Sequence, residues 1–96
     1  MTADLHVTEV WVSEHYWPAM AAELVTAQAQ RLTRAGALAT VVLPGEQTAF
    51  GLHVAHNADE VRHVLRGLGL GHGSIEAGWL LDHPPAESKI SVVAPR

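Results

Sequence analysis

Residues 38–55 read LATVVLPGEQTAFGLHVA, and this stretch decides the fold because it holds two strand patterns separated by a short turn. The runs 38–43 and 48–55 are rich in apolar and β-branched residues, which favour extended backbone. The four residues between them, Pro44 to Gln47, contain the proline and glycine typical of a tight turn. The stretch therefore predicts an antiparallel hairpin in the middle of the chain.

The second strand of this hairpin has two different faces, since successive side chains of a strand point to opposite sides. One face carries the larger apolar side chains of Phe50, Leu52 and Val54, and we expect it to pack against helices. The other face carries small residues and one imidazole: Ala49, Gly51, His53 and Ala55. A face of this kind would suit the wall of a cavity.

A helix is predicted on each side of the hairpin. The alanine-rich segment 19–35 follows Pro18, which fits a first helical turn, and precedes Gly36, which fits a left-handed C-cap. The predicted buried face of this helix comprises Ala21, Leu24, Val25, Gln28, Leu32 and Ala35. After the hairpin, Asn57 and Glu60 have the spacing of a capping box. Apolar residues then recur at helical spacing at Val61, Val64, Leu65 and Leu68.

Two outer strands complete the pattern, at residues 5–13 (LHVTEVWVS) and 74–81 (SIEAGWLL). The element order is β-α-β-β-α-β, which predicts an α+β, ferredoxin-like fold: one antiparallel sheet with two helices on one face. We expect a single domain over residues 1–96, with a core at 5–84 and a tail at 85–96. A short β-like segment at 89–93 in this tail could pair with the sheet edge of another subunit.

Composition excludes several classes of protein. The formal charge is −4 and no basic cluster occurs, which argues against binding to nucleic acid. No apolar run approaches the ~18 residues of a membrane span, and the first residues do not resemble a signal peptide, so we expect a cytoplasmic protein that does not bind membranes. A chain of 96 residues without cysteine has a small core and no disulfides, so we expect support from a homodimer or larger homo-oligomer.

Histidines are the first candidates for chemistry, because imidazole titrates nearest to neutral pH. His72 lies among four glycines, where backbone can wrap closely around a ligand, and His53 is the one polar group on the small-residue face of its strand. We predict that this pair acts as acid and base. His6 or Tyr16 would donate a hydrogen bond to the substrate oxygen.

Large apolar side chains are candidates for binding the substrate. Three tryptophans could line an apolar pocket, and a carboxylate on the last strand could support a histidine. The predicted substrate-binding residues are Trp11, Trp17, Phe50, Trp79 and Glu76. Glu9, on an otherwise apolar face of the first strand, is expected to form an ion pair across an oligomer interface.

A metal site is not predicted, although the chain has seven histidines. His53 and His56 are three residues apart, which on a strand puts them on opposite faces, and no His-x-His pair or cysteine occurs. The glycine-rich run 67–73 follows a helix and precedes a strand, the reverse of the order in a nucleotide-binding loop.

Several short motifs, taken in order, resemble the muconolactone isomerase family. These are Leu5-His6-Val7, Ala29-Gln30-Arg31-Leu32 with Gly36, the Gly45 turn, and Ile75-Glu76 through Leu80 to His83-Pro84. The resemblance implies a dimeric α+β barrel, assembled through the sheets into dimers and larger rings. The β-like segment at 89–93 could be a C-terminal strand exchanged between the subunits of such a dimer. It also implies a cofactor-free isomerase, and relatives with this fold often use histidines at the places of His6 and His72.

The resemblance implies proton transfer across an unsaturated lactone, but the family's basic residues on the first two strands are absent here. A buried anion without a paired cation is costly. We therefore predict a cofactor-independent isomerase or cyclase acting on a small apolar carbonyl or lactone compound, in polyketide-like secondary metabolism or aromatic catabolism. A cofactor-free monooxygenase on the same fold and a non-catalytic small-molecule-binding or assembly module are the alternatives.

Overall fold

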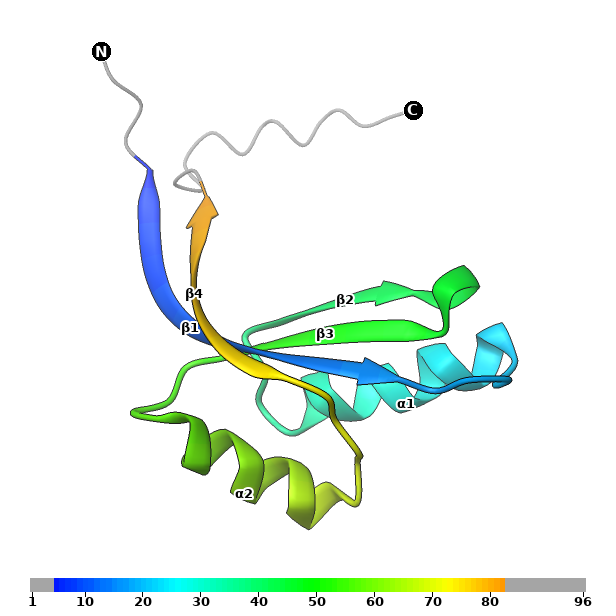
Figure 1. The fold of residues 1–96 in the computed structure, drawn as a ribbon. Helices are drawn as coiled ribbons and strands as arrows, with labels where there is room; N and C mark the ends of the chain where they lie inside the picture. The colour runs from blue at the N-terminus through cyan, green and yellow to red at the C-terminus, as the bar shows by residue number, and fades with distance from the viewer. Residues whose placement is uncertain (1–4, 83–96) are drawn as a thin grey trace.

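Residues 5–82 are described by a computed structural model, shown in Figure 1. The strands are β1 (His6–Tyr16), β2 (Ala39–Leu43), β3 (Thr48–His53) and β4 (Ile75–Asp82). The helices are α1 (Ala22–Arg34) and α2 (Ala58–Leu68), with a short 3-10 helix, η1 (Pro44–Glu46), in the hairpin turn. No helix in this part of the chain is long and apolar enough to cross a membrane.

The four strands form one antiparallel sheet in the order β2-β3-β1-β4, with both helices on the same side of it (Figure 1). The hairpin predicted at 38–55 is confirmed, because Val41 of β2 pairs with Phe50 of β3 and Leu43 pairs with Thr48. The α+β class, the antiparallel sheet and the two helices are as predicted, and the arrangement is compatible with a ferredoxin-like fold. The predicted strand at 89–93 and its exchange lie outside the described residues.

The first strand is longer than predicted, and this changes the site. It ends at Tyr16 instead of Ser13, because the ladder with β3 continues through the pairs Ser13–Gly51 and His15–Ala49. His15 and Tyr16, which follow the predicted strand, therefore belong to β1. His15 consequently points to the same side of the sheet as Ser13.

The first helix begins later than predicted. Pro18 is not in its first turn; instead Ala19 adopts a positive φ of 66° and the backbone N–H of Met20 donates to the carbonyl of Trp17. This turn carries the chain from the sheet to the helix layer before α1 starts at Ala22. The buried residues of α1 are Val25, Ala29 and Leu32, whereas Leu24, expected on the buried face, is 55% exposed.

The two faces of β3 are the reverse of the prediction. Ala49, Gly51 and His53 are buried beneath the helices, and Phe50 and Leu52 lie half-buried on the opposite face of the sheet. The reason is the close approach of α1, which contacts β3 and buries Ala29 completely. Small residues on both elements allow this approach. The small-residue face of β3 is therefore mostly packed interior, with an imidazole inside it.

The main apolar cluster lies between the helices and the sheet. Its buried members come from both helices and from the segments that follow them: Leu32, Ala37, Val61, Leu65 and Leu70. Trp11 and Ile75 of the sheet and Trp17 pack against this cluster. The cluster thus fixes α2 against β1 and β4, next to the buried polar residues described below.

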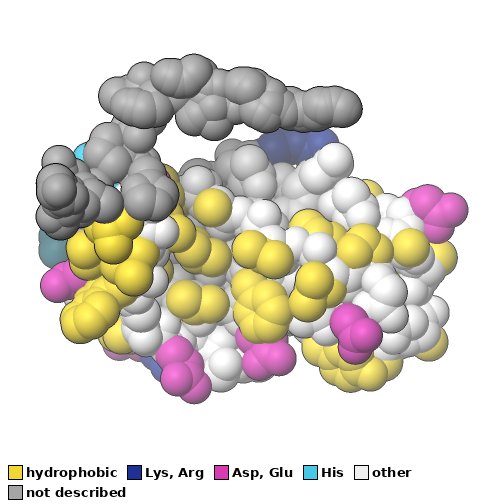
Figure 2. Space-filling model, turned by 90° about the horizontal axis from the view of Figure 1, so that it is seen from above, with side chains coloured by type: hydrophobic (Ala, Val, Ile, Leu, Met, Phe, Trp, Pro, Cys, Tyr) yellow, Lys and Arg dark blue, Asp and Glu magenta, His cyan; other side chains and the backbone are white. Residues whose placement is uncertain are grey.

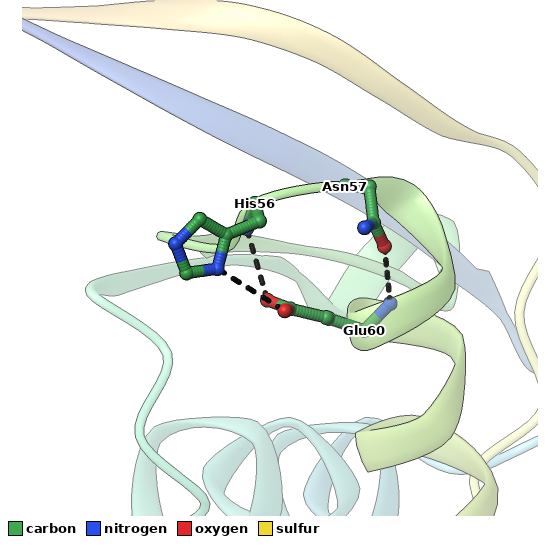
Figure 3. Close-up of polar contacts among 3 residues, drawn as sticks. All are labelled: His56, Asn57 and Glu60. Atoms are coloured by element: carbon green, nitrogen blue, oxygen red, sulfur yellow. Dashed lines mark hydrogen bonds and ion pairs between the residues drawn. The ribbon is translucent and has the colours of Figure 1, made fainter.

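The start of α2 is capped as predicted (Figure 3). Asn57 Oδ1 accepts a hydrogen bond from the backbone N–H of Glu60 at 3.0 Å. The carboxylate of Glu60 accepts one from the backbone N–H of His56 at 2.9 Å, and this bond lowers the pKa of Glu60. His56 Nδ1 lies 3.1 Å from the other oxygen of Glu60. At the other end of the helix, Gly69 adopts the left-handed conformation of a C-cap.

Replacing Asn57 with alanine is expected to lower the free energy of unfolding by about 1 kcal/mol, because one helical N–H then loses its partner. Urea unfolding followed by tryptophan fluorescence measures this change. Asn57→Asp keeps an acceptor at this position and should retain most of the stability. Equal losses for both variants would contradict the capping role.

Apolar side chains gather on the sheet face away from the helices, with acidic side chains among them (Figure 2). By register, Val12 and Leu52 lie beside each other on this face, and Phe50 lies beside Val41. Val41 is 49% exposed and Leu43 is 42% exposed. Exposed apolar surface of this kind is typical of an interaction site.

Candidate functional site

Three buried polar side chains form a hydrogen-bonded row between the sheet and the helices. Ser13 Oγ lies 2.8 Å from His53 Nε2 on one side and 2.8 Å from His15 Nε2 on the other. His15 Nδ1 lies 2.7 Å from the carbonyl oxygen of Gly71. Ser13 and His15 are fully buried and His53 is 9% exposed. This arrangement, the His53–Ser13–His15 row, joins strands β1 and β3 to the glycine-rich loop.

The partners fix the direction of every hydrogen bond in the row. The Gly71 carbonyl can only accept, so Nδ1 of His15 carries a proton, and in neutral His15 Nε2 accepts. The Ser13 hydroxyl therefore donates to His15, and its oxygen accepts the Nε2–H of His53. It follows that Nδ1 of neutral His53 carries a lone pair, and no hydrogen bond within residues 5–82 occupies it.

Burial keeps both imidazoles neutral. Loss of solvation lowers the pKa of His15, although its bond to Gly71 works in the opposite direction, and nearby His72 lowers it further. Burial also lowers the pKa of His53, and the neighbouring His15 adds to this effect. A neutral imidazole with a free ring nitrogen can act as a general base near pH 7.

Local sequence explains how the row is assembled. The register that pairs Ser13 with Gly51 and Trp11 with His53 brings the serine and the imidazole to one face of adjacent strands. Gly51 must lack a side chain, because a Cβ there would lie 2.8 Å from His53 Nε2 and 3.0 Å from Ser13 Oγ. Small residues in β3 therefore provide the space that the row fills.

The glycine-rich loop is pinned to β1 by two backbone hydrogen bonds. The N–H of Gly73 donates to the carbonyl of Glu14 at 2.7 Å, and the N–H of Glu14 donates to that of Ser74 at 3.0 Å. These bonds hold the preceding residues of the loop over the end of β1, where Gly71 meets His15. On another side, the Trp17 ring stacks on His15, with centroids 5.8 Å apart. Loop and indole together exclude water from His15.

His53 also borders a pocket of about 150 Å³ between the two helices. The walls come from the end of α1, the end of β3 and the first turns of α2: Ala35, Gly36, Val54, Ala55, Glu60, Val61 and Val64. Most of these residues are aliphatic, but polar atoms make up about half of the surface that lines the pocket. The carboxylate of Glu60, which is one of these polar groups, is engaged with His56. The structure therefore places the imidazole of His53 at the wall of a small, open pocket of mixed polarity.

A second and larger pocket, of about 300 Å³, contains two of the predicted substrate-binding tryptophans. Trp11 and Trp79 project from the same side of neighbouring strands, and Glu9 is the direct cross-strand partner of Trp79. Ala55 lines both this pocket and the one at His53. Trp79 is 72% exposed, so this pocket is an open groove on the surface. Within residues 5–82, Glu9 forms no ion pair; the expected partner across an oligomer interface lies outside a single chain.

The other predicted catalytic residues lie apart from His53. His6 and Tyr16 are at opposite ends of β1 and on its other face, and His6 is about 16 Å along the strand from Trp11, the partner of His53. His6 Nδ1 lies 4.0 Å from Asp82 on the surface. His72 is exposed in the loop, and its ring contacts only the neighbouring carbonyl of Gly73 in the described part of the chain. Neither predicted oxygen donor reaches the pocket.

The remaining predicted substrate-binding residues do not share one pocket with the tryptophan pair. Trp17 packs against the apolar cluster and on His15. Phe50 and Glu76 lie on the sheet face away from the helices, as the register places them beside Glu14 and Val12. The structure therefore brings His53 close to Ser13 and His15. Of the predicted substrate-binding residues, it brings only Trp11 and Trp79 together in one pocket.

Ser13 and His15 were not among the sequence candidates. Their spacing of two residues puts both on one face of a strand, and the same spacing includes Trp11. That signal was available, but it required the strand to continue past Ser13. No cluster of three or more histidine, aspartate or glutamate side chains with metal-binding geometry occurs among residues 5–82.

The neutral imidazoles predict how stability depends on pH. In the unfolded chain both histidines take up protons near the usual pKa of 6.5, whereas the folded protein resists this uptake. The free energy of unfolding is therefore highest above about pH 6.5. It should fall at lower pH by at most about 1.4 kcal/mol per pH unit for each imidazole. Urea unfolding at a series of pH values measures this slope.

A control separates these two histidines from the exposed ones. His63→Gln removes a solvent-exposed imidazole from α2 and should leave the slope unchanged. A free energy of unfolding that stays constant as the pH falls below about 6.5 would show that the two buried imidazoles are protonated as easily as in the unfolded chain.

Comparisons with protein-family models, with curated proteins and with solved structures find no match to this chain. The resemblance to the muconolactone isomerase family therefore stays a prediction from short sequence motifs.

Proposed function

We propose that this protein is a cofactor-independent isomerase or cyclase that moves a proton within a small, apolar carbonyl or lactone compound, with His53 as the general base. The observation that carries the proposal is the His53–Ser13–His15 row. It supports a neutral His53 whose Nδ1 is free at the wall of a pocket. Buried imidazoles with lowered pKa values are more frequent at functional sites than elsewhere.

The pocket supports a small and uncharged substrate. Its volume of about 150 Å³ is below the ~300 Å³ at which pockets for drug-sized ligands begin. No lysine or arginine lines it, and the carboxylate of Glu60 does, so an anionic substrate would have no cationic partner there and would be repelled by Glu60. A carbonyl or lactone of a few carbon atoms matches both properties.

The proposed reaction keeps atoms and charge in balance. His53 Nδ1 takes a proton from the carbon next to the substrate carbonyl, and the electrons of that C–H bond move into the enolate. His53 Nδ1 then returns a proton to a different carbon, which shifts the double bond. General base catalysis of this kind contributes about 10²- to 10⁴-fold in rate. No oxidant is consumed.

The experiment is proton NMR of small lactones and enones incubated with the protein in deuterated water. We expect one compound class to show a shifted double bond or replacement of a proton by deuterium at the carbon next to the carbonyl. The same compound should perturb the ring signals of His53. A compound that binds at His53 yet keeps its protons and bond positions would contradict the proposal and favour a binding module.

We also propose that the protein self-associates through the apolar sheet face that contains Val41 and Phe50. Exposed apolar side chains on this face support the proposal. Native mass spectrometry tests it: a dimer or larger ring is expected, and Val41→Glu should shift the population to monomer. A wild-type protein that is monomeric at all concentrations would contradict it.

A further inference from the structure

The His53–Ser13–His15 row contains two groups that the proposed base does not itself require. A single neutral imidazole could remove a proton without Ser13 and His15. Burying three polar side chains is costly unless each is satisfied, and here the described side chains and the Gly71 carbonyl provide a partner for every polar atom of the row except His53 Nδ1. The row is continuous, with every link between 2.7 and 2.8 Å. Links of this length allow protons to move along it.

We propose that Ser13 and His15 form a proton relay behind His53, in which a proton accepted at His53 Nδ1 comes to rest as positive charge on His15. As Nδ1 of His53 gains a proton, its Nε2–H passes to Ser13 Oγ. The Ser13 hydroxyl proton passes at the same time to His15 Nε2. His53 ends neutral with the proton on Nδ1, and His15 becomes an imidazolium. One proton enters and every hydrogen bond in the row is kept, with its direction reversed between His53 and His15.

Burial opposes a positive charge on His15, and two contacts of this ring work in the other direction. The Nδ1–H of His15 donates to the Gly71 carbonyl, and a hydrogen bond accepted from a charged donor is stronger than one from a neutral donor. The adjacent carboxylate of Glu14 also attracts a positive His15, while nearby His72 opposes it if protonated. Around His53, the nearest carboxylate in the pocket wall is Glu60, which is already bonded to His56.

The geometry also limits the row to one proton. If both imidazoles were charged, both Nε2–H groups would donate to Ser13 Oγ, and the hydroxyl proton would lose its acceptor. Two positively charged rings would also lie on either side of one buried serine and repel each other. The row should therefore resist a second proton more strongly than the first.

The test follows the ring nitrogens of both histidines by ¹H–¹⁵N NMR during acidification of the whole protein, from about pH 7.5 to 4.5 around the usual imidazole range. We expect His15 to become doubly protonated first. In the same step, neutral His53 should change from the Nε2–H to the Nδ1–H tautomer. If His53 becomes doubly protonated while His15 stays neutral, the relay is wrong. This titration needs no substrate and no variant.

Variants add a second readout, which rests on the proposed function. Ser13→Ala interrupts the row and should abolish the coupled tautomer change. It should also lower the rate of proton transfer by about tenfold or more, a part of the usual effect of general base catalysis. Ser74→Ala is the matched control: it removes an exposed hydroxyl whose only described contact is a 3.4 Å approach to Glu14.

The two proposals fail separately. A coupled tautomer change with no reaction in any bound compound would overturn the proposed function and leave the relay standing. Proton transfer that Ser13→Ala leaves at the wild-type rate would overturn the relay and leave His53 as an independent base.

Discussion

Replacing His53 with glutamine is expected to lower the rate of proton transfer by about 10²- to 10⁴-fold, the usual contribution of a positioned general base. Glutamine has an amide N–H that can still donate to Ser13, so the packing around the row can be largely kept. Its side chain has no basic nitrogen. The variant therefore removes the base while retaining the donor, and rates of isomerisation or deuterium incorporation measure the loss.

Two other histidines provide controls for this result. His63→Gln changes an exposed residue of α2 and should leave the rate within about twofold of wild type, as expected for a surface change away from the site. His72→Gln tests the residue that the sequence favoured as the partner of His53. Because His72 lies on the loop surface and reaches neither the row nor the pocket by a described contact, its loss should have a small effect. A larger loss for His72→Gln than for His53→Gln would contradict the assignment of the base.

Replacing Gly51 with alanine is expected to lower the free energy of unfolding by about 1–3 kcal/mol, the usual range for an added methyl group in a packed interior. The new Cβ would lie 2.8 Å from His53 Nε2, where no atom can be accommodated without movement. Either His53 or Ser13 must leave its position, and the hydrogen bond between them is then lost. Proton transfer should fall together with stability. Urea unfolding and the exchange assay measure both effects.

Gly67 offers a control for the general effect of glycine-to-alanine substitution. It lies within α2, and a Cβ there would meet no atom within 4 Å. Gly67→Ala should therefore increase stability by up to about 1 kcal/mol, because alanine favours the helix. A Gly51→Ala protein as stable and as active as wild type would mean that the row is not held as closely as its distances indicate.

Much of the fold follows from local sequence signals. The turn at Pro44 and Gly45, the Asn57 cap and the glycine with positive φ after the first helix, Gly36, each have a strong chemical preference, and the structure has them where expected. The later start of α1 was not predictable from Pro18 alone, because a proline fits a turn as well as a first helical position. Tertiary pairing decided that boundary: the backbone N–H of Trp17 donates to the carbonyl of Gln47.

The candidate site was predicted only in part. His53 is a candidate because one imidazole among small residues is unusual, and the structure places it in the interior. Its neighbours depend on strand register, which the sequence of one chain does not specify. The pairing of Ser13 with Gly51 sets which side chains meet, and a single-residue slip would place Ser13 on the other face. His72, by contrast, was selected for its glycine-rich surroundings, and these glycines instead bring a backbone carbonyl to His15.

The most direct test of the central claim is the tautomeric state of His15 and His53 at neutral pH, read from ring ¹⁵N chemical shifts and their couplings to the ring protons. The described hydrogen bonds require His15 to carry its proton on Nδ1 and His53 on Nε2, leaving His53 Nδ1 unprotonated and able to accept a proton. This pair of tautomers is the predicted result. A protonated Nδ1 on His53 at neutral pH would contradict the account, because the proposed base would have no lone pair to offer.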